Sequence, residues 1–380
     1  MAQKQPDRRV RIWHARFWHG MTFSVWMRLL AYGRFAVAPI KWGHVLTITL
    51  TSIINSAAAL AQHILKGREI EAVKLPADPI FVIGHWRSGT TLLHELMILD
   101  DRVIFPDTFQ CMSPHHFLLT ASYAGMVKFL VPSNRPMDDM QAGWHLPQED
   151  EFALMNLGLP SPYLQIAFPD APRRRGTLSL SGLDAHELRK WREGLVWFLK
   201  AVTLQSGPKQ IVVKSPTHTA RVKTLIDLYP NARFVLITRD PAAVLGSTLK
   251  LWTRLCDSQG LQLSDHSKMA ERIAKEFEEM MEALIADVKA LPQGQFHHLH
   301  YSDLTEDPIA QMRETYAALG RDGFDQVAPK IEAYFAERHD FKVDAYRLSE
   351  DLQAVVDTRW QPLMDRLFDA LAARNGASAD

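Results

Sequence analysis

We predict from the sequence an α/β fold, in which a parallel sheet is flanked by helices and preceded by a helical arm. Short, wholly apolar runs, typical of buried parallel strands, alternate along the chain with segments of helical periodicity. Such an alternation favours a parallel sheet with helices on both faces. The expected strands are residues 80–84, 210–216, 232–241 and 295–304.

The expected helices follow the strands in order. Asp184 suits the N-cap of one of them, because Glu187 stands three residues later and apolar residues then recur at helical spacing. Between residues 105 and 180 prolines and aromatics are frequent, and we expect loops with short helices there. One helix is expected to begin at Thr91, and three others are expected at residues 183–204, 219–230 and 267–291.

The N-terminal 75 residues form the expected arm, and a catalytic domain of residues 76–380 follows the prolines at its start. Residues 45–61 of the arm carry no charge, but this run of seventeen is shorter than the about 20 that a membrane span needs. Three interpretations stay open for it. It is a helix packed on the catalytic domain or in a homodimer contact, a hairpin lying in a membrane surface, or a transmembrane helix.

The amino-acid composition argues against nucleic acid as a partner and favours a reducing cellular compartment. Lys plus Arg equals Asp plus Glu at 43 each, so no overall charge attracts the chain to nucleic acid. Two cysteines, Cys111 and Cys256, are too few for a disulfide framework or a zinc site. We therefore expect a cytoplasmic protein, at the inner face of the membrane if the arm contacts lipid. No metal-ligand spacing occurs among the 16 His, so no metal is expected.

The turn after the first strand has the layout of a phosphate-binding loop. It keeps a G-x-x-x-x-G frame, with Thr91 at the Ser/Thr position and a helix whose N-terminus favours an anion. Thr90 stands where nucleoside triphosphatases carry their lysine, and Arg87 lies inside the turn instead. The forked guanidinium of Arg87 can hold two oxygens of a shorter anion. The sequence thus predicts a sheet like that of the P-loop NTPases, with a loop for a substituted phosphate rather than ATP.

Four motifs in this order resemble those of sulfotransferases that use 3′-phosphoadenosine-5′-phosphosulfate (PAPS). The loop is similar to the family's K/R-S-G-T-T motif, and KSPTH at 214–218 to its strand-end lysine motif. Arg239, with Ser247 eight residues later, resembles the 3′-phosphate motif, and Tyr301 resembles the tyrosine near the adenine. The resemblance implies PAPS as the donor, bound by Arg87, Ser88, Gly89, Thr90, Thr91, Arg239, Ser247 and Tyr301.

Two further segments, PQEDEF at 147–152 and SPHHF at 113–117, are most similar to the bacterial branch grouped with tyrosylprotein and carbohydrate sulfotransferases. The chain lacks the C-terminal glycine-rich loop of the cytosolic animal enzymes and departs from them at two further positions. Leu92 stands in place of a tryptophan that stacks on the adenine, and Pro216 falls about where those enzymes carry a catalytic histidine. The departure at Pro216 leaves the catalytic base to be found among other residues.

Sulfuryl transfer requires cations near the transferred group and a base near the acceptor hydroxyl. Arg87 is the first candidate cation, since it takes the place of the family's catalytic lysine; the alternative is that it pairs with a structural carboxylate. Lys214 ends a buried strand, where a lysine is costly unless it faces an anion. The alternative interpretation is that Lys214 is an ordinary surface lysine.

The base stays open among several residues. A group of carboxylates after Pro147 either complements a helix dipole or supplies the base. Related carbohydrate and tyrosylprotein enzymes carry a catalytic glutamate a short way after the loop, where this chain has Asp107. The candidates are Glu149, Asp150, Glu151 and Asp107, followed by His218 and His115.

We therefore expect a sulfotransferase that moves the sulfuryl group from PAPS to a hydroxyl and releases adenosine 3′,5′-bisphosphate, with no metal required. The acceptor is a small molecule or a lipid, and the apolar arm and the aromatic 105–180 segment favour a bulky alcohol. Two alternatives stay open: a nucleoside or small-molecule kinase of the P-loop class, and a membrane-associated binding protein without turnover.

Overall fold

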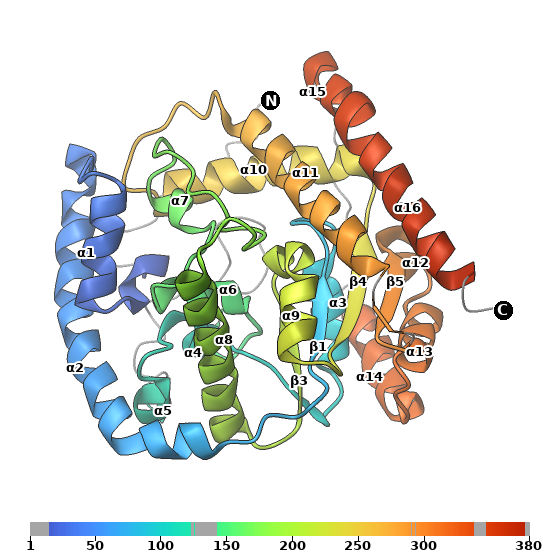
Figure 1. Cartoon of the computed structure of the whole chain (residues 1–380), viewed down its shortest axis with the longest axis horizontal. Coiled ribbons are helices and arrows are strands. Elements are labelled where there is room, and N and C mark those ends of the chain that lie inside the picture. Colours follow the sequence, from blue (N-terminus) through green and yellow to red (C-terminus); the bar gives the residue numbers. More distant parts are fainter. Residues whose placement is uncertain are drawn as a thin grey trace.

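A parallel sheet of five strands forms the centre of the protein (Figure 1). The computed structural model describes residues 15–122, 125, 143–289, 291–292, 294–337 and 347–376. Neighbouring strands are parallel throughout the order β2-β3-β1-β4-β5, which confirms the predicted α/β class. The strands are β1 (Ile80–Ile83), β2 (Val103–Ile104), β3 (Gln210–Lys214), β4 (Arg233–Thr238) and β5 (Phe296–His300).

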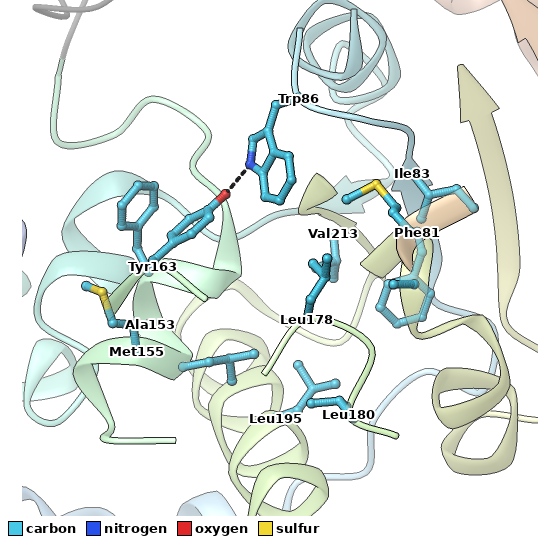
Figure 2. Packing of buried hydrophobic residues seen from close by; sticks show 14 of the residues in the cluster. Phe81, Ile83, Trp86, Ala153, Met155, Tyr163, Leu178, Leu180, Leu195 and Val213 are labelled. Atoms are coloured by element: carbon cyan, nitrogen blue, oxygen red, sulfur yellow. Dashed lines mark hydrogen bonds between the residues drawn. The ribbon is translucent and has the colours of Figure 1, made fainter. Parts of the chain in front are cut away.

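Successive residues of each strand point to opposite faces, so the sheet lies between two cores. Phe81 and Ile83 of β1 join the larger core, part of which Figure 2 shows. Ile80 and Val82 join the smaller core on the other face. In the register of the sheet, Val82 lies beside Lys214, so the end of β3 is level with the start of the loop after β1.

Helices cover both faces of the sheet. The larger core contains residues of α8 (Ala185–Ser206), α9 (Val222–Leu228), α10 (Pro241–Gln259), α11 (Met269–Val288) and α16 (Gln361–Gly376). The smaller core contains residues of α3 (Thr90–Met97), α12 (Tyr301–Glu306), α13 (Pro308–Ala318) and α14 (Phe324–Ala336). The expected short helices of the 105–180 segment are α4 (Thr108–Met112), α5 (Phe117–Thr120), α6 (Asp150–Asn156) and α7 (Leu164–Ala167).

The predicted elements are confirmed with three changes. Asp184 caps α8, as expected, and its carboxylate accepts hydrogen bonds from the amides of His186 and Glu187 at 2.9 and 2.8 Å. The helix expected at 219–230 is instead a 3₁₀ turn, Pro216–Ala220, followed by α9. The strand expected at 295–304 ends at His300, and Tyr301 begins α12. Strand β2 was not predicted.

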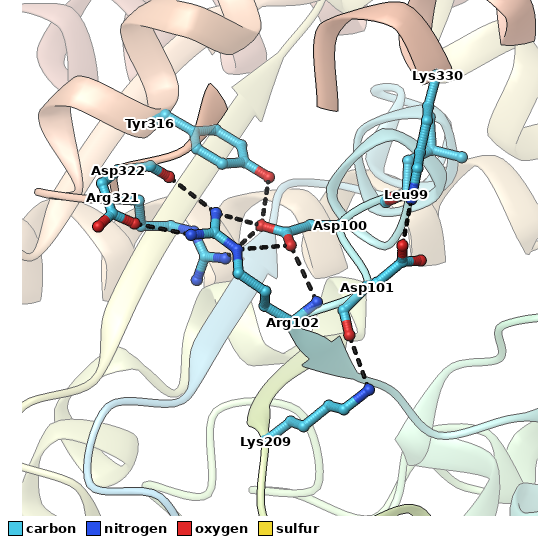
Figure 3. A network of polar contacts seen from close by, with 9 residues as sticks. All are labelled: Leu99, Asp100, Asp101, Arg102, Lys209, Tyr316, Arg321, Asp322 and Lys330. Carbon is cyan, nitrogen blue, oxygen red and sulfur yellow. Dashed lines mark hydrogen bonds and ion pairs between the residues drawn. The ribbon is translucent and has the colours of Figure 1, made fainter. Parts of the chain in front are cut away.

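An ion-pair network around the buried Asp100 ties the loop before β2 to α13 and the turn that follows it (Figure 3). Asp100 accepts hydrogen bonds from Arg102 Nε at 2.9 Å, Arg321 at 2.8 Å and the Tyr316 hydroxyl at 3.0 Å. Burial alone would raise the pKa of Asp100, but these hydrogen bonds outweigh burial and hold the pKa well below its ordinary value. The network lies beside the short strand β2, which few ladder hydrogen bonds hold.

From residue 15 on, where the structure describes it, the N-terminal arm consists of two helices and two 3₁₀ turns packed against α8 and α6. The long helix α2 contains the whole uncharged run, and the fully buried Trp18 and Trp26 anchor the arm in the larger core. Among the described residues, one helix, Pro39–Ala72, is long and apolar enough to cross a membrane. The elements are η1 (Phe17–Gly20), α1 (Phe23–Tyr32), η2 (Pro39–Lys41) and α2 (Trp42–Ala72). The division into an arm and a catalytic domain at residue 76 stays a prediction.

Candidate active site

The loop between β1 and α3 lies at the carboxyl edge of the sheet, and its backbone requires glycine at two positions. Gly84 and Gly89 have φ of +146° and +110°, and Arg87 also has a positive φ, +68°. A Cβ on Gly84 would lie 2.5 Å from the carbonyl oxygen of Ile237, and one on Gly89 would lie 2.4 Å from the Tyr301 ring. Only glycine therefore lets the loop approach β4 and α12 this closely.

Side chains within and beside the loop fix its shape. The Thr219 hydroxyl accepts from the amide of Gly84 at 2.7 Å and donates to its carbonyl at 3.1 Å. The buried Ser88 hydroxyl donates to the carbonyl of His85 at 2.7 Å. Thr90 is buried and Thr91 half-buried in the first turn of α3, where backbone N–H groups have no partner inside the helix. This arrangement suits an anion at the helix N-terminus.

The predicted nucleotide-binding residues converge from four parts of the chain. Arg87 Nε donates to Ser247 Oγ in α10 at 2.8 Å. The Arg239 guanidinium, just after β4, lies 4.4 Å from the centre of the Tyr301 ring and donates to the carbonyl of Arg87 at 3.3 Å. Cations and an aromatic ring beside a glycine cradle fit a ligand that carries a 5′-phosphate, a purine and a further phosphate.

Lys214 and Glu149 form an ion pair beside the loop. Lys214 Nζ lies 2.8 Å from Glu149 Oε1, and the two side chains are 3% and 16% exposed, respectively. The Tyr163 hydroxyl donates to the other carboxylate oxygen, and it accepts from Trp86 Nε1 of the loop at 2.8 Å (Figure 2). A chain of contacts thus runs from the phosphate-binding loop through Tyr163 to Glu149 and Lys214.

The neighbouring carboxylates of α6 are fully buried and have partners other than Lys214. Glu151 binds the buried Arg221 and accepts from the Thr217 hydroxyl at 2.8 Å. Asp150 accepts from the Ser215 hydroxyl at 2.6 Å and contacts His218 Nε2 at 2.9 Å. Burial alone would raise the pKa of Asp150, but the opposing charge and hydrogen bonds, those of His218 first, lower it. These contacts favour a structural role for the predicted candidates Glu151, Asp150 and His218.

Asp107 and His115 occupy different surroundings. Asp107 caps α4 by accepting from the Gln110 amide at 2.8 Å, and it forms an isolated bridge with Pro147, two residues before Glu149. Burial raises the pKa of Asp107. His115 Nε2 donates to the carbonyl of Asn156 at 2.9 Å, at the opposite end of α6 from Glu149. Because Asp107 is bridged to Pro147, close in sequence to Glu149, it stays the second candidate base.

The structure adds Trp86 and Tyr163 to the candidate site, and the sequence analysis did not identify them. Trp86 was visible as a loop residue, since it lies between Gly84 and Arg87. Tyr163 carried no signal, because it lies in the 105–180 segment, where no periodicity indicates which side chains face the sheet. Both are nearly fully buried, with exposed fractions of 4% and 2%.

The fold and the site define a nucleotide-dependent transferase built on a P-loop-like sheet. A model of the sulfotransferase family matches residues 79–326, and the chain belongs to this family. It is a PAPS-dependent sulfotransferase, as the motifs predicted. The family assignment sets aside the kinase and the binding protein without turnover.

One relative matches nearly the whole chain, and a more distant one matches about two thirds of it. The chain is 39% identical over 359 residues to omega-hydroxy-beta-dihydromenaquinone-9 sulfotransferase Stf3 of Mycobacterium bovis, covering 94% of this chain and 92% of the relative. It is 25% identical over 285 residues to human carbohydrate sulfotransferase 5, covering 67% of this chain and 63% of that protein. The predicted similarity to carbohydrate sulfotransferases is therefore confirmed, as a distant one.

Solved structures show the same fold. Sulfotransferase STF9 from Mycobacterium avium superposes with a TM-score of 0.64 at 18% identity, over 89% of this chain and 95% of that chain. STF1 from Mycobacterium tuberculosis H37Rv superposes with a TM-score of 0.61 at 16% identity, over 88% and 91%. The sheet with its covering helices is therefore a sulfotransferase fold.

Proposed function

We propose that the acceptor is the hydroxyl of a bulky, lipid-like alcohol. One observation carries this proposal: the 39% identity to a relative named for an omega-hydroxylated dihydromenaquinone, a hydroxyl on a large apolar molecule. The similarity covers 94% of this chain, so it includes most of the N-terminal arm as well as the catalytic region. An acceptor of the same chemical class is the simplest reason for two chains to share both parts.

In the proposed reaction, the acceptor oxygen attacks the sulfur of PAPS in line with the leaving group. A bond from that oxygen to sulfur forms, and the bond from sulfur to the 5′-phosphate oxygen breaks. Glu149 takes the hydroxyl proton, and the leaving phosphate oxygen keeps the electron pair. Arg87 and Lys214 stabilise the charge that develops on the sulfuryl group and the leaving oxygen. The products are a sulfate ester and adenosine 3′,5′-bisphosphate.

Glu149 is the proposed base because it is the partly exposed carboxylate of the 149–151 group. Lys214 and Tyr163 hold its two oxygens, so the carboxylate has one orientation before substrates bind. When the donor occupies the loop, the flexible Lys214 side chain turns to the phosphosulfate, and the released carboxylate oxygen accepts the proton. Lys214 thus leaves the Glu149 carboxylate and binds the phosphosulfate of the donor instead.

We infer that the transfer needs no metal. Arg87 and Lys214 supply two positive charges at the place where a divalent cation would otherwise act, and sulfuryl transfer depends mainly on positioning and charge stabilisation. Enzyme treated with EDTA should therefore retain its turnover. A loss that Mg²⁺ restores would overturn this part of the proposal.

The acceptor class is tested by offering the purified chain PAPS with three hydroxyl compounds: a polyprenyl alcohol, a simple phenol and a hexose. We expect sulfation of the polyprenyl alcohol, detected by mass spectrometry as the addition of one SO₃ group. The Arg87→Ala variant serves as the blank, because it removes the proposed cation. Preferential sulfation of the phenol or the sugar would overturn the lipid-alcohol assignment and leave the donor assignment intact.

A further inference from the structure

Helix α2 exposes a row of large apolar side chains. Each is more than half exposed, and with 3.6 residues per turn their positions fall on one side of the helix. Of thirteen large apolar side chains exposed in the described part of the chain, nine lie between Ile40 and Leu65. The outer face, as we call it, consists of Trp42, Leu46, Leu50, Ile53, Ile54, Leu60, Ile64 and Leu65.

The opposite side of α2 faces the protein and carries several polar groups. Asn55 Nδ2 donates to the carbonyls of His19 at 2.6 Å and Met21 at 3.1 Å. Gln62 Oε1 accepts from the amide of Leu118 at 2.9 Å. A helix on a soluble surface ordinarily shows the reverse pattern, with apolar residues inward and polar residues outward. The pattern of α2 indicates that its outer face meets an apolar environment.

These contacts indicate how α2 would meet a membrane. His44 contacts Arg16 at 2.9 Å near one end of the helix, and Gln62 binds Leu118 near the other, so α2 is fastened lengthwise to the rest of the chain. If α2 spanned a bilayer, this polar side would have to leave its partners and enter hydrocarbon, where unpaired polar groups are costly. Lying flat, the helix keeps every one of these hydrogen bonds.

The charges around the outer face fit anionic lipid. From Ala15 to Arg68 the sequence has no Asp or Glu, while basic residues flank both ends of the outer face. Two copies packed through this face would bring their basic residues together, which disfavours a dimer. Acidic headgroups would instead neutralise them, and an interfacial Trp at one end suits the headgroup level. The basic residues that are exposed or half-buried are Arg28, Arg34, Lys41, Lys66 and Arg68.

We propose that the outer face of α2 binds the surface of an anionic lipid bilayer, with the helix lying in the membrane plane and not crossing it. Figure 1 shows α2 at the periphery of the molecule, running down the left side and continuing along the lower edge. Docking there holds the enzyme at the boundary between lipid and water. Vesicle binding requires no acceptor, so a wrong acceptor assignment would leave this proposal standing.

Flotation of the full chain with vesicles tests the proposal. We expect binding to vesicles of phosphatidylcholine with phosphatidylglycerol, and weaker binding to phosphatidylcholine alone. Ile54→Glu places a charge in the centre of the outer face and should lower the bound fraction roughly 10-fold. Phe368→Glu is the control, because Phe368 is an exposed apolar residue on α16, at the opposite edge of the molecule (Figure 1), and this variant should bind like the parent. Equal binding by parent and Ile54→Glu would overturn the proposal.

Two further measurements test the alternatives, a second copy of the chain on the outer face and a membrane-spanning α2. Light scattering should find the same mass for parent and Ile54→Glu; a dimeric parent that the substitution makes monomeric would show that a second copy covers the face. Membranes from cells that express the full chain should release it into alkaline carbonate, and retention would show that α2 spans the bilayer. The comparison of lipid compositions uses the unaltered chain, so it tests the proposal even if a variant fails to fold.

Discussion

The Nε of Arg87 donates a hydrogen bond to Ser247 Oγ at 2.8 Å, although the two residues are 160 positions apart in the chain. Arg87 belongs to the loop after β1 and Ser247 to α10, which follows β4, and β1 and β4 are neighbours in the sheet. One guanidinium therefore links the loop predicted to bind the 5′-phosphosulfate with the motif predicted to bind the 3′-phosphate. A nucleotide that carries both groups can engage the two parts together.

Arg239→Ala tests whether the second part recognises the 3′-phosphate. A charge-assisted hydrogen bond contributes about 1.5–3 kcal/mol. Loss of this contact should weaken the binding of adenosine 3′,5′-bisphosphate about 10- to 150-fold. Binding of 5′-ADP should change little, because ADP lacks that phosphate. Calorimetric titration of both nucleotides against both proteins gives the four affinities.

A matched control for Arg239→Ala is Arg313→Ala. The Arg313 guanidinium also lies over an aromatic ring, 4.7 Å from the centre of Phe324, but it belongs to α13. Arg313→Ala should leave both affinities unchanged. If the preference for the bisphosphate persists in Arg239→Ala, the 3′-phosphate assignment is wrong.

Much of the fold could be predicted because the apolar runs and the helical periodicity are strong. Strands β1, β3, β4 and β5 were identified, and the carboxyl ends of parallel strands meet at one edge. Motifs that follow these strands therefore had to lie near one another, as Arg87, Arg239 and Tyr301 do. Strand β2 has two residues, too few to produce a pattern.

The details of the acceptor side could not be predicted. Glu149, Asp150 and Glu151 are consecutive, and which one meets Lys214 depends on where α6 begins. Glu149 is the N-cap and turns toward Lys214, whereas the other two begin the buried helix. The bond from Trp86 to Tyr163 joins residues 77 positions apart, and no motif marks the tyrosine. Tertiary packing alone brings them together.

Glu149→Gln should lower turnover at least about 100-fold, a typical contribution of a general base. The amide keeps the size of the side chain but cannot take the hydroxyl proton. Bisphosphate affinity should stay within a few-fold of the parent, since Glu149 is not part of the nucleotide site. Turnover close to that of the parent would instead move the role to Asp107, which Asp107→Asn then tests.

Glu151→Gln should act on stability rather than on chemistry. It breaks the fully buried ion pair with Arg221, and an unpaired buried charge costs about 3–5 kcal/mol. The free energy of unfolding should fall by that order in a urea titration. Turnover per folded molecule, measured at low temperature, should stay near that of the parent. A 100-fold loss of turnover in a variant of unchanged stability would contradict the structural role.

The Asp100 network should make stability depend on acid pH. The folded-state pKa of Asp100 lies well below the ordinary value of 3.8, so the network is complete above that value. As the pH falls below it toward the folded-state pKa, the unfolded chain binds the proton first and stability is lost. Asp100→Asn should lower the free energy of unfolding by about 1–3 kcal/mol at pH 7, with a smaller difference near pH 3. Urea titrations at both pH values measure it.

Asp322→Asn is the control for Asp100→Asn. Asp322 pairs with the same Arg102 at 2.7 Å, but its side chain is 97% exposed, and exposed pairs contribute little. We expect the pH dependence of this variant to match that of the parent. A difference between Asp100→Asn and the parent that is the same at both pH values would show that the charge of Asp100 is not responsible.

Tyr163→Phe tests whether the chain of contacts from the loop to Glu149 positions the carboxylate. The ring keeps its packing, but the hydroxyl that donates to Glu149 and accepts from Trp86 is lost. Glu149 then keeps Lys214 as its polar partner on one oxygen, and its orientation is less fixed. We expect kcat to fall about 10-fold, the order of effect that loss of alignment produces, with little change in bisphosphate affinity. Steady-state kinetics with PAPS and the polyprenyl alcohol separate kcat from KM.

A second buried tyrosine allows the positioning effect to be separated from a general loss of stability. Tyr316 donates its hydroxyl to Asp100 at 3.0 Å, and its side chain is as well buried as that of Tyr163. Tyr316→Phe should lower the free energy of unfolding by about 1 kcal/mol and leave kcat unchanged. If Tyr163→Phe lowers stability by the same amount and also leaves kcat unchanged, its hydroxyl serves the fold alone. A fall in kcat for Tyr163→Phe but not for Tyr316→Phe would show that the hydroxyl of Tyr163 holds Glu149 in the position that the reaction requires.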